Sequence, residues 1–375
     1  MTMKRRGNLF NQVTDFNHLC RSARLAAHGT FNRDSLSFMF DLERNVVELK
    51  RQLEGRQYLP GEYRTFCITD PKPRTISASP FRDRVVHHSL CGTLEPVIER
   101  YLIDDCYACR VGKGTVAAIE RARVFVRRFE RFAKLDVRHY FETADHGVLK
   151  AVIRRLVKDP GVLWLTDLFI DKGAPGSFPG KGMPIGNLTS QNFANLYLGP
   201  FDHFVKETVR VPGYVRYMDD ILLFDDDAIR LKQAVVLATT FLEGMLLNTK
   251  DEAFRTGRTS DGVPFLGFNI FPAVIRFDRI RRRRFRAIVP TSGHRPAPRR
   301  QFPCRRGRTL GRPPRLVASE NRCRTSGRPC HICDISDPKA VTKFVSRRVT
   351  RWLTDQPAVV SNYLWLSVCY TRRVV

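Results

Sequence analysis

Two adjacent acids, Asp219 and Asp220, lie between two apolar segments that are rich in β-forming residues. Residues 214–224 therefore predict a β-hairpin with Met218, Asp219 and Asp220 at its tip. Adjacent carboxylates at a tight turn repel each other unless a cation lies beside them, and hard oxygen ligands suit Mg²⁺. The pattern indicates a divalent-metal site, although a solvated acidic turn is the alternative for an Asp-Asp pair taken alone.

A third acid, Asp136, ends another apolar segment, Lys134-Leu135-Asp136-Val137. This segment predicts a short strand, followed by a turn and by a helix from about Asp145. An acid at the end of a strand can bind a metal when an acidic hairpin lies alongside. Taken alone, Asp136 would equally serve to cap the next segment.

A basic hairpin is expected nearer the N-terminus, with strands at 63–68 and 74–77 and a turn at 70–73. It presents Lys72 and Arg74. Arginine offers a planar fork and lysine a point charge, so together they suit a triphosphate. The alternative is a solvated basic hairpin.

Helices must hold these strands in place. Apolar residues at helical spacing predict three helices, from about 34 to 55, from 81 onward and from about 228 to 246. Gly55 is the expected end of the first helix. His87 and His88 fall within the second helix and are interpreted as partly buried helix residues rather than as metal ligands.

The chain of 375 residues carries 64 Lys and Arg against 37 Asp and Glu, a net charge of +27. This excess indicates a polyanionic partner, with nucleic acid as the first candidate and a membrane surface as the second. No run of about 18 apolar residues occurs and the first residues lack a signal-type apolar core, so we expect no membrane association and a cytoplasmic location. Ten cysteines without a disulfide-scaffold spacing fit a reducing compartment.

The segment Tyr217-Met218-Asp219-Asp220, followed by an apolar strand, resembles the catalytic hairpin of reverse transcriptases. Further blocks resemble that family in the correct order, and the resemblance covers about residues 60 to 270. In one block glycines would let the backbone approach a phosphate, although its spacing does not match a Walker loop. The last block resembles the hairpin that grips the primer. The blocks are Lys72–Arg84, Arg110–Thr115, Lys134–Phe141, Gly182–Gln191, Leu247–Lys250 and Phe265–Phe268.

The resemblance implies an α+β, right-hand polymerase fold, with fingers and palm built from an antiparallel sheet and packed helices and with an atypical or missing thumb. Residues 1–58 would form an N-terminal helical extension, 59–275 the fingers and palm, and 276–375 a basic segment in the thumb position. Residues 290–338, rich in Arg, Pro, Gly and Ser, indicate a disordered RNA-binding tail or a frameshifted stretch; the missing thumb pattern favours the frameshift. Helical patterning returns at 341–353.

Zinc is a further alternative for this C-terminal part, but the spacing of its candidate ligands is wrong for common modules. The candidates are Cys304, Cys323, Cys330, His331 and Cys333.

The resemblance also implies roles for the acids. Two Mg²⁺ ions, with Mn²⁺ as a substitute, would be held by Asp136, Val137, Asp219 and Asp220 for phosphoryl transfer. Lys250 would lie near the leaving phosphates, as a general acid or only as a counter-charge.

The incoming nucleotide would contact the fingers and the Gly182–Gln191 block. Phe141 would abut its sugar and exclude a 2′ hydroxyl, and the alternative is an ordinary core phenylalanine. Asparagine and serine side chains are expected to cap the helix that the block opens. The implied substrate-binding residues are Lys72, Arg74, Phe141, Ile185, Gly186 and Gln191.

Two positions separate this chain from most reverse transcriptases. Ile185 stands where most carry Gln, and Gln191 stands where most carry Pro. This pair resembles the enzymes of diversity-generating retroelements. The resemblance implies error-prone, adenine-mutagenic copying of a template-repeat RNA into cDNA, with a primer, deoxynucleoside triphosphates and a small basic pentameric accessory protein as partners. The alternatives are a retron or group II intron-like enzyme and a catalytically inactive RNA-binding protein of the polymerase fold.

Overall fold

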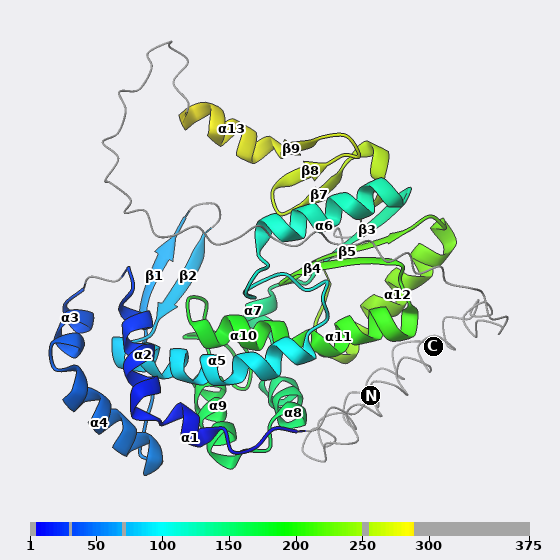
Figure 1. The fold of residues 1–375 in the computed structure, drawn as a ribbon. Coiled ribbons are helices and arrows are strands. Elements are labelled where there is room, and N and C mark those ends of the chain that lie inside the picture. The colour runs from blue at the N-terminus through cyan, green and yellow to red at the C-terminus, as the bar shows by residue number, and fades with distance from the viewer. Residues whose placement is uncertain (1–4, 30–31, 70–72, 250–254, 289–375) are drawn as a thin grey trace, which may run out of the picture.

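The structure is a computed structural model that describes residues 5–29, 32–69, 73–249 and 255–288 (Figure 1). Its α-helices are α1 (Phe10–Val13), α2 (Phe16–Ala27), α3 (Arg33–Phe40), α4 (Leu42–Glu54), α5 (Phe81–Tyr101), α6 (Thr115–Arg128), α7 (Tyr140–Thr143), α8 (His146–Leu156), α9 (Pro160–Lys172), α10 (Leu188–Tyr197), α11 (Gly199–His203), α12 (Ala228–Gly244) and α13 (Arg279–Ile288). A π-helix, η1 (Phe204–Val209), follows α11, and a 3₁₀ turn, η3 (Thr259–Asp261), precedes β7. The strands are β1 (Arg64–Ile68), β2 (Arg74–Ala78), β3 (Arg131–Asp136), β4 (Gly213–Tyr217), β5 (Asp220–Asp225), β6 (Arg255–Arg258), β7 (Val263–Phe265), β8 (Phe268–Ile270) and β9 (Ile275–Phe277).

The central sheet has the strand order β4-β5-β3-β6, and every neighbouring pair in it is antiparallel. Successive side chains of a strand point to opposite faces, so Ile221 and Leu223 join one hydrophobic cluster and Leu222 joins another. Helices α10, α11 and α12 supply residues to the first cluster, and α6 with β7 and β8 supplies the second. Because both faces are covered (Figure 1), the hairpin β4–β5 is apolar along nearly its whole length.

The strands β1 and β2 form a separate two-stranded antiparallel sheet. Helix α5 begins soon after β2, and α2 and α10 both pack against it. Apolar residues of α2 and α4 belong to the same hydrophobic cluster as those of α5. The N-terminal helices are therefore part of the core that supports the predicted fingers.

The prediction of one helix over residues 34–55 was wrong, because α3 and α4 are separated at Asp41. Asp41 has φ −118° and ψ 50°, which is outside the helical region. Aspartate competes for backbone hydrogen bonds with its short side chain, which favours such interruptions. The predicted end was correct, since Gly55 directly follows the last residue of α4, and the apolar residues Val46 and Leu49 of this helix are buried.

Strands β7 and β8 form the hairpin predicted at residues 265–268. Their two-residue turn consists of Leu266 and Gly267, with φ 49° and 80°. Two positive φ values match the right-handed twist of paired strands, which is why glycine is favoured there. Strand β9 joins this sheet, and the arginine-rich α13 follows it.

Among the described residues, no helix is long and apolar enough to cross a membrane.

Several predictions concern residues outside the described ranges. The predictions that lie outside are those for Lys72, Lys250, the segment 290–338, the helix at 341–353 and the C-terminal cysteines and histidine.

Candidate active site

The three predicted acids lie at one end of the central sheet. Asp136 is the last residue of β3, Asp220 is the first of β5, and the two are direct partners in the antiparallel register. Directly opposed residues place their Cβ atoms about 4.5–5.5 Å apart. Asp219 precedes Asp220 in the turn, and all three residues are half-buried. The fold thus brings together three residues that are up to 84 positions apart, from Asp136 to Asp220.

The turn between β4 and β5 contains only Met218 and Asp219, because Tyr217 pairs with Asp220. The predicted hairpin is therefore confirmed. Met218 has φ 54°, in the left-handed region that costs a residue with a side chain about 1–2 kcal/mol. The residue immediately before the acids is held in a conformation that needs support from its surroundings.

Asp220 also has a basic neighbour. Nζ of Lys134 lies 2.6 Å from Oδ1 of Asp220, and the two side chains are 20% and 25% exposed. Among the described residues no three His, Cys, Asp or Glu side chains converge as a metal-binding group. The carboxylates still suit a hard cation as ligands. Asp136 and Asp220 are directly opposed in the sheet, and each has one buried carboxylate oxygen.

The loop before α10 connects the predicted fingers to the palm. The Ser77 N–H donates to the Ile185 carbonyl at 2.8 Å, so β2 is tied to this loop. Ile185 is half-buried and Gly186 is exposed. Gly186 has φ 114°, and a Cβ there would lie 2.8 Å from Cγ2 of Ile76, so a larger residue would force the loop away from β2.

Phe141 lies in α7, directly after the strand that carries Asp136. Its ring centroid is 5.7 Å from that of Tyr140, and its carbonyl accepts a hydrogen bond from the Met183 N–H at 2.6 Å. The side chain packs against the main hydrophobic cluster and is half-buried. Its exclusion of a 2′ hydroxyl stays a prediction.

Asn187 precedes α10, but no side chain caps this helix. The prediction of asparagine and serine caps was therefore wrong. Oδ1 of Asn187 instead accepts hydrogen bonds from the Ser79 N–H at 3.3 Å and the Ser79 hydroxyl at 2.8 Å. The asparagine binds the loop to the segment that leads into α5.

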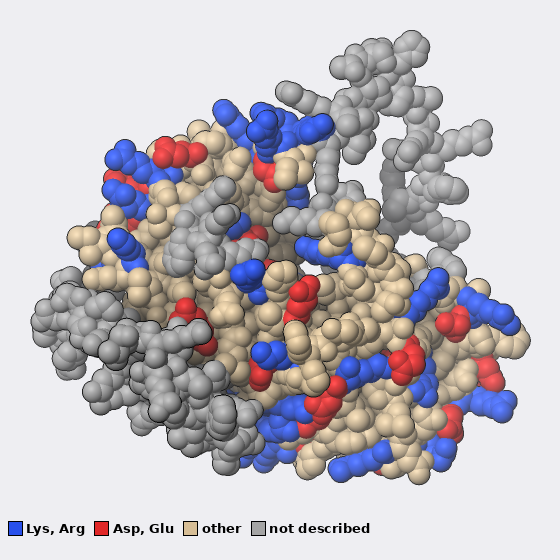
Figure 2. Space-filling view, turned by 180° about the vertical axis from the view of Figure 1, so that it is seen from behind, with Lys and Arg blue, Asp and Glu red and all other residues tan. Residues whose placement is uncertain are grey.

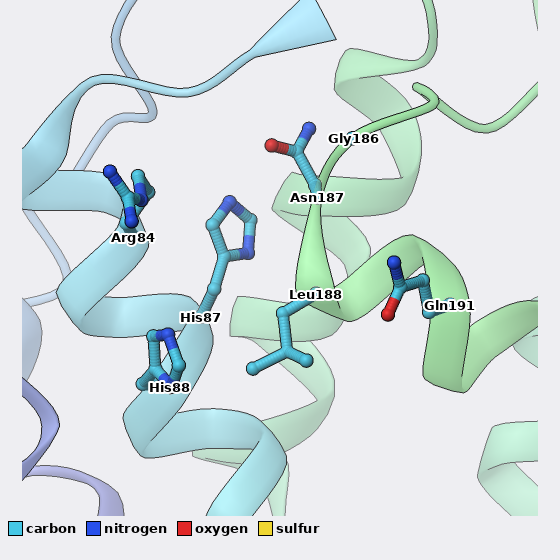
Figure 3. A pocket seen from close by; sticks show the side chains of 7 residues that line it. All are labelled: Arg84, His87, His88, Gly186, Asn187, Leu188 and Gln191. Atoms are coloured by element: carbon cyan, nitrogen blue, oxygen red, sulfur yellow. The ribbon is translucent and has the colours of Figure 1, made fainter. Parts of the chain in front are cut away.

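A hollow lies between α5 and the start of α10 (Figure 3). His87 is buried beside it, with Nδ1 2.9 Å from Oγ1 of Thr189 and Nε2 3.2 Å from Oγ of Ser79. Burial, with the nearby charges, lowers the pKa of His87 to about 3, so the ring is neutral at pH 7. The hollow is lined by Arg84, His87, His88, Gly186, Asn187, Leu188 and Gln191.

The predicted phosphate ligands are only partly described. Arg74 is exposed at the start of β2, opposite Ile68. Thr249 forms an isolated antiparallel bridge with Val137, which places Thr249, from the block that ends in Lys250, beside the end of β3.

In the Arg110–Thr115 block the side chain of Arg110 is turned inward and bound within the protein, so it is not available to a phosphate. Nη2 of Arg110 lies 2.8 Å from Oε2 of Glu99, and Nη1 donates to the carbonyls of Ile103 and Cys106 at 2.6 and 2.9 Å. The Arg110 side chain is 4% exposed. It stabilises the loop from within, and approach of the backbone to a phosphate stays a prediction.

Sequence reasoning missed Lys134 and a buried pair, Arg216 and Asp202. Neither side chain of the pair is exposed, and Nη2 of Arg216 lies 2.6 Å from Oδ2 of Asp202. A signal was available, because Arg216 is the one charged residue in a strand otherwise made of Gly, Tyr and Val. A charge at an inward strand position needs a buried partner.

An antiparallel sheet with three acids at one end, covered on both faces and joined to a two-stranded hairpin, defines the fingers and palm of a nucleic-acid polymerase. The family model described as reverse transcriptase (RNA-dependent DNA polymerase) matches residues 69–270. The chain belongs to this family. The α+β, right-hand polymerase fold predicted from the sequence is confirmed.

Two curated relatives are similar over part of the chain. Protein YkfC of Escherichia coli (strain K12) is 25% identical over 175 residues, 42% of this chain and 45% of YkfC. The group II intron-encoded protein LtrA of Lactococcus lactis subsp. cremoris is 23% identical over 170 residues, 44% of this chain and 28% of LtrA. The chain thus spans less than half the length of these relatives.

Among solved structures, the apo telomerase of Candida tropicalis, truncated from the C-terminal domain, aligns with a TM-score of 0.47 at 11% identity. The alignment covers 59% of this chain and 55% of that one.

Proposed function

We propose that the chain catalyses RNA-templated, primer-dependent synthesis of DNA. The observation that carries this proposal is the register of the central sheet, which pairs Asp136 with Asp220 and sets Asp219 in the turn beside them. Membership of the reverse transcriptase family supports it.

In this proposal Asp136, Asp219 and Asp220, with Val137, hold two Mg²⁺ ions or Mn²⁺ in their place. When bound, such ions lower the pKa of the primer 3′ hydroxyl and neutralise the leaving pyrophosphate. The half-buried setting of the acids favours this, because charge interactions strengthen where water is partly excluded.

Other side chains position the nucleotide. Arg74 contacts its triphosphate together with Lys72, and Phe141 limits the space beside the sugar at the 2′ position. Lys250 acts near the leaving phosphates, as a general acid or as a counter-charge. Gln191 and Gly186 both line the hollow between α5 and α10, beside the loop that β2 contacts.

The partners are template RNA, a primer and deoxynucleoside triphosphates. The net charge of +27 supports binding of a polyanion. Figure 2 shows Lys and Arg over much of one face, with Asp and Glu among them.

We also propose that the enzyme is of the diversity-generating retroelement type. Ile185 and Gln191 support this, since both depart from the usual family block in the way those enzymes do. The proposal adds error-prone copying at template adenines and a small basic pentameric accessory protein. The similarity to LtrA makes a group II intron-like enzyme the second candidate.

The test is Asp219→Asn, which removes one charge from the acidic site and none from the basic surface. We expect the variant to lose Mg²⁺-dependent primer extension while its affinity for RNA, measured at a fixed salt concentration, stays within about twofold. Asp261→Asn is the matched control, because Asp261 is exposed in η3 and away from the sheet end.

Near-normal extension by Asp219→Asn would exclude the proposed site. A wild-type chain that binds RNA but never extends a primer, with Mg²⁺ or Mn²⁺, would instead support the inactive RNA-binding alternative.

A further inference from the structure

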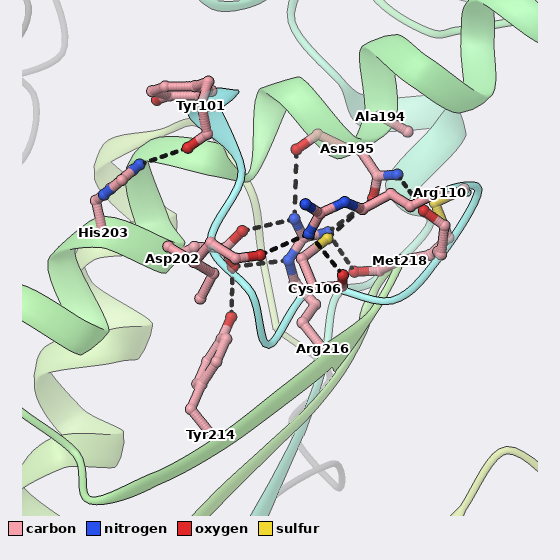
Figure 4. A network of polar contacts seen from close by, with 12 residues as sticks. Tyr101, Cys106, Arg110, Ala194, Asn195, Asp202, His203, Tyr214, Arg216 and Met218 are labelled. Atoms are coloured by element: carbon pink, nitrogen blue, oxygen red, sulfur yellow. Dashed lines mark hydrogen bonds and ion pairs between the residues drawn. The ribbon is translucent and has the colours of Figure 1, made fainter. Parts of the chain in front are cut away.

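An ion pair is buried between β4, which carries Arg216, and α11, which carries Asp202 (Figure 4). Arg216 and Asp202 are both 0% exposed. Nη2 and Nε of Arg216 contact Oδ2 and Oδ1 of Asp202 at 2.6 and 2.7 Å. The Tyr214 hydroxyl donates to Oδ1 of the same carboxylate at 2.5 Å. One side of the guanidinium is thus fully bound to α11, the helix that carries Asp202.

The other side of the guanidinium reaches the turn. Nη1 of Arg216 donates to the Met218 carbonyl at 3.1 Å and to Oδ1 of Asn195 at 3.3 Å. Nη2 donates to the Asn195 carbonyl at 3.3 Å. Met218 is the residue with positive φ directly before Asp219, and Asn195 belongs to α10, the helix that follows the loop of Ile185 and Gly186.

The backbone of Arg216 is fixed as well. Its N–H donates to the Asp105 carbonyl at 2.9 Å, and its carbonyl accepts from the Tyr107 N–H at 3.0 Å. β4 is the edge strand of the central sheet, so these bonds replace a missing neighbour strand. The guanidinium therefore starts from a fixed position when it reaches Met218.

An ion pair buried this deeply contributes little to the free energy of folding by itself. Apolar residues of similar volume often stabilise a core as well as a buried ion pair or better, because two charges must lose their hydration. Burial lowers the pKa of Arg216, but the Asp202 carboxylate more than reverses this, so the guanidinium stays charged. What an apolar core could not supply is a donor for the Met218 carbonyl.

We propose that Arg216 is a positioning residue: held by Asp202, it fixes the Met218–Asp219 turn and couples the metal-binding acids to α10 and the nucleotide loop. This inference rests on the proposed function. It concerns the orientation of Asp219 and Asp220, since Arg216 itself touches neither substrate nor metal.

The decisive variant removes the whole pair without leaving an uncompensated charge. Tyr214→Phe, Asp202→Leu and Arg216→Met are combined in one chain, so that no buried acid or hydroxyl loses its partner. We expect a thermal midpoint close to that of the wild type. We also expect kcat for extension to fall about 10- to 100-fold, as for small displacements of reacting groups, and the Mg²⁺ concentration at half-maximal rate to rise about tenfold.

Arg216→Lys keeps the positive charge beside Asp202 but supplies one ammonium in place of a fork. It should show the same rise in Mg²⁺ requirement, and it serves as the second variant if the triple variant does not fold. Tyr58→Phe is the stability control. It removes a buried tyrosine–aspartate hydrogen bond of 2.6 Å, to Asp83 in the fingers, and should leave the Mg²⁺ requirement unchanged.

Mn²⁺ binding to each chain without nucleic acid, measured by calorimetry, separates this inference from the proposed function. Weaker Mn²⁺ binding by the triple variant or by Arg216→Lys supports the positioning role even if no chain extends a primer. A folded triple variant, or a folded Arg216→Lys, with the wild-type Mn²⁺ affinity and Mg²⁺ requirement would overturn it.

Discussion

The two hairpins that carry the predicted chemistry differ in how they are supported. Every residue of β5 except Asp220 is buried, and β4 is buried up to Tyr217. By contrast β1 is exposed throughout, and in β2 only Ser77 is buried. The hairpin β4–β5 belongs to a four-stranded sheet, in which β5 has a neighbour strand on each side, whereas β1 and β2 form a two-stranded sheet by themselves.

The difference teaches where this fold needs precision. In the proposed function the acids are metal ligands, which must stay within a fraction of an ångström, and they lie on a packed hairpin whose turn accepts a hydrogen bond from Arg216. The proposed function has a triphosphate arrive and leave in every cycle, and Arg74, its proposed ligand, lies on an exposed hairpin that is joined to the loop before α10 through Ser77. Elements with few buried contacts open most easily.

The largest expected effect comes from making the same substitution in both hairpins. Arg216→Met leaves the Asp202 carboxylate buried without its partner, and we expect the free energy of unfolding to fall by about 3–5 kcal/mol. Arg74→Met changes an exposed residue and should alter it by at most about 0.5 kcal/mol. Urea denaturation of both variants measures the difference.

A loss of less than about 1 kcal/mol in Arg216→Met, with an unchanged denaturant slope, would contradict the comparison. It would mean that Asp202 finds another partner or takes up a proton in the core.

The hairpins themselves could be predicted because their information is local. Two apolar segments rich in β-forming residues, with a short acidic turn between them, specify β4–β5, and the positions of Asp219 and Asp220 follow directly. The position of Asp136 beside Asp220 could be inferred only through the family resemblance, since pairing between β3 and β5 joins segments far apart in the sequence.

What the sequence did not reveal depends on partners that are remote. Arg216 was visible as a charge in an apolar strand, but Asp202, its partner across the core, carries no local signal. The Lys134 contact with Asp220 requires the β3–β5 register to be known. Asn187 was expected to cap α10 because local bonding is the usual role of asparagine, yet Ser79 competes successfully for its side chain.

The next effect concerns the exposed hairpin alone. Arg74→Ala should raise KM for deoxynucleoside triphosphates about 10- to 100-fold, since a hydrogen bond to a charged group contributes about 1.5–3 kcal/mol. Thermal stability should not change. Arg64→Ala is the control, because Arg64 is also exposed but lies at the opposite end of the same hairpin, paired with Ala78. Equal effects of Arg64→Ala and Arg74→Ala would show that only overall charge matters.

A smaller effect is expected at the acids. Lys134→Met removes the ammonium 2.6 Å from Asp220, so a metal no longer competes with it for that carboxylate. A partly exposed ion pair contributes about 0.2–1 kcal/mol, and the Mg²⁺ concentration at half-maximal rate should fall by about 1.5- to 5-fold. Lys150→Met is the matched control, since it breaks a 2.6 Å pair with Asp171 away from the sheet end. A rise in the Mg²⁺ requirement would show that Lys134 assists the acids instead.

The smallest effect is expected at Ile185, on the loop before α10 that is hydrogen-bonded to β2. In related enzymes with Gln at this position, the amide can hydrogen-bond near the incoming nucleotide, whereas Ile offers only apolar contact. One net hydrogen bond contributes about 1 kcal/mol, so Ile185→Gln should lower misincorporation opposite template adenine by at most about fivefold. The variant should fold, because the bond from Ser77 uses the carbonyl of Ile185 and not its side chain, and the side chain is only half-buried. Sequencing of cDNA made from one template by the wild type, Ile185→Gln and the control Ile275→Gln, at the one half-buried position of β9, measures the error rate. An unchanged adenine error rate in a well-folded Ile185→Gln would leave Ile185 as a packing residue and remove it from the account of fidelity.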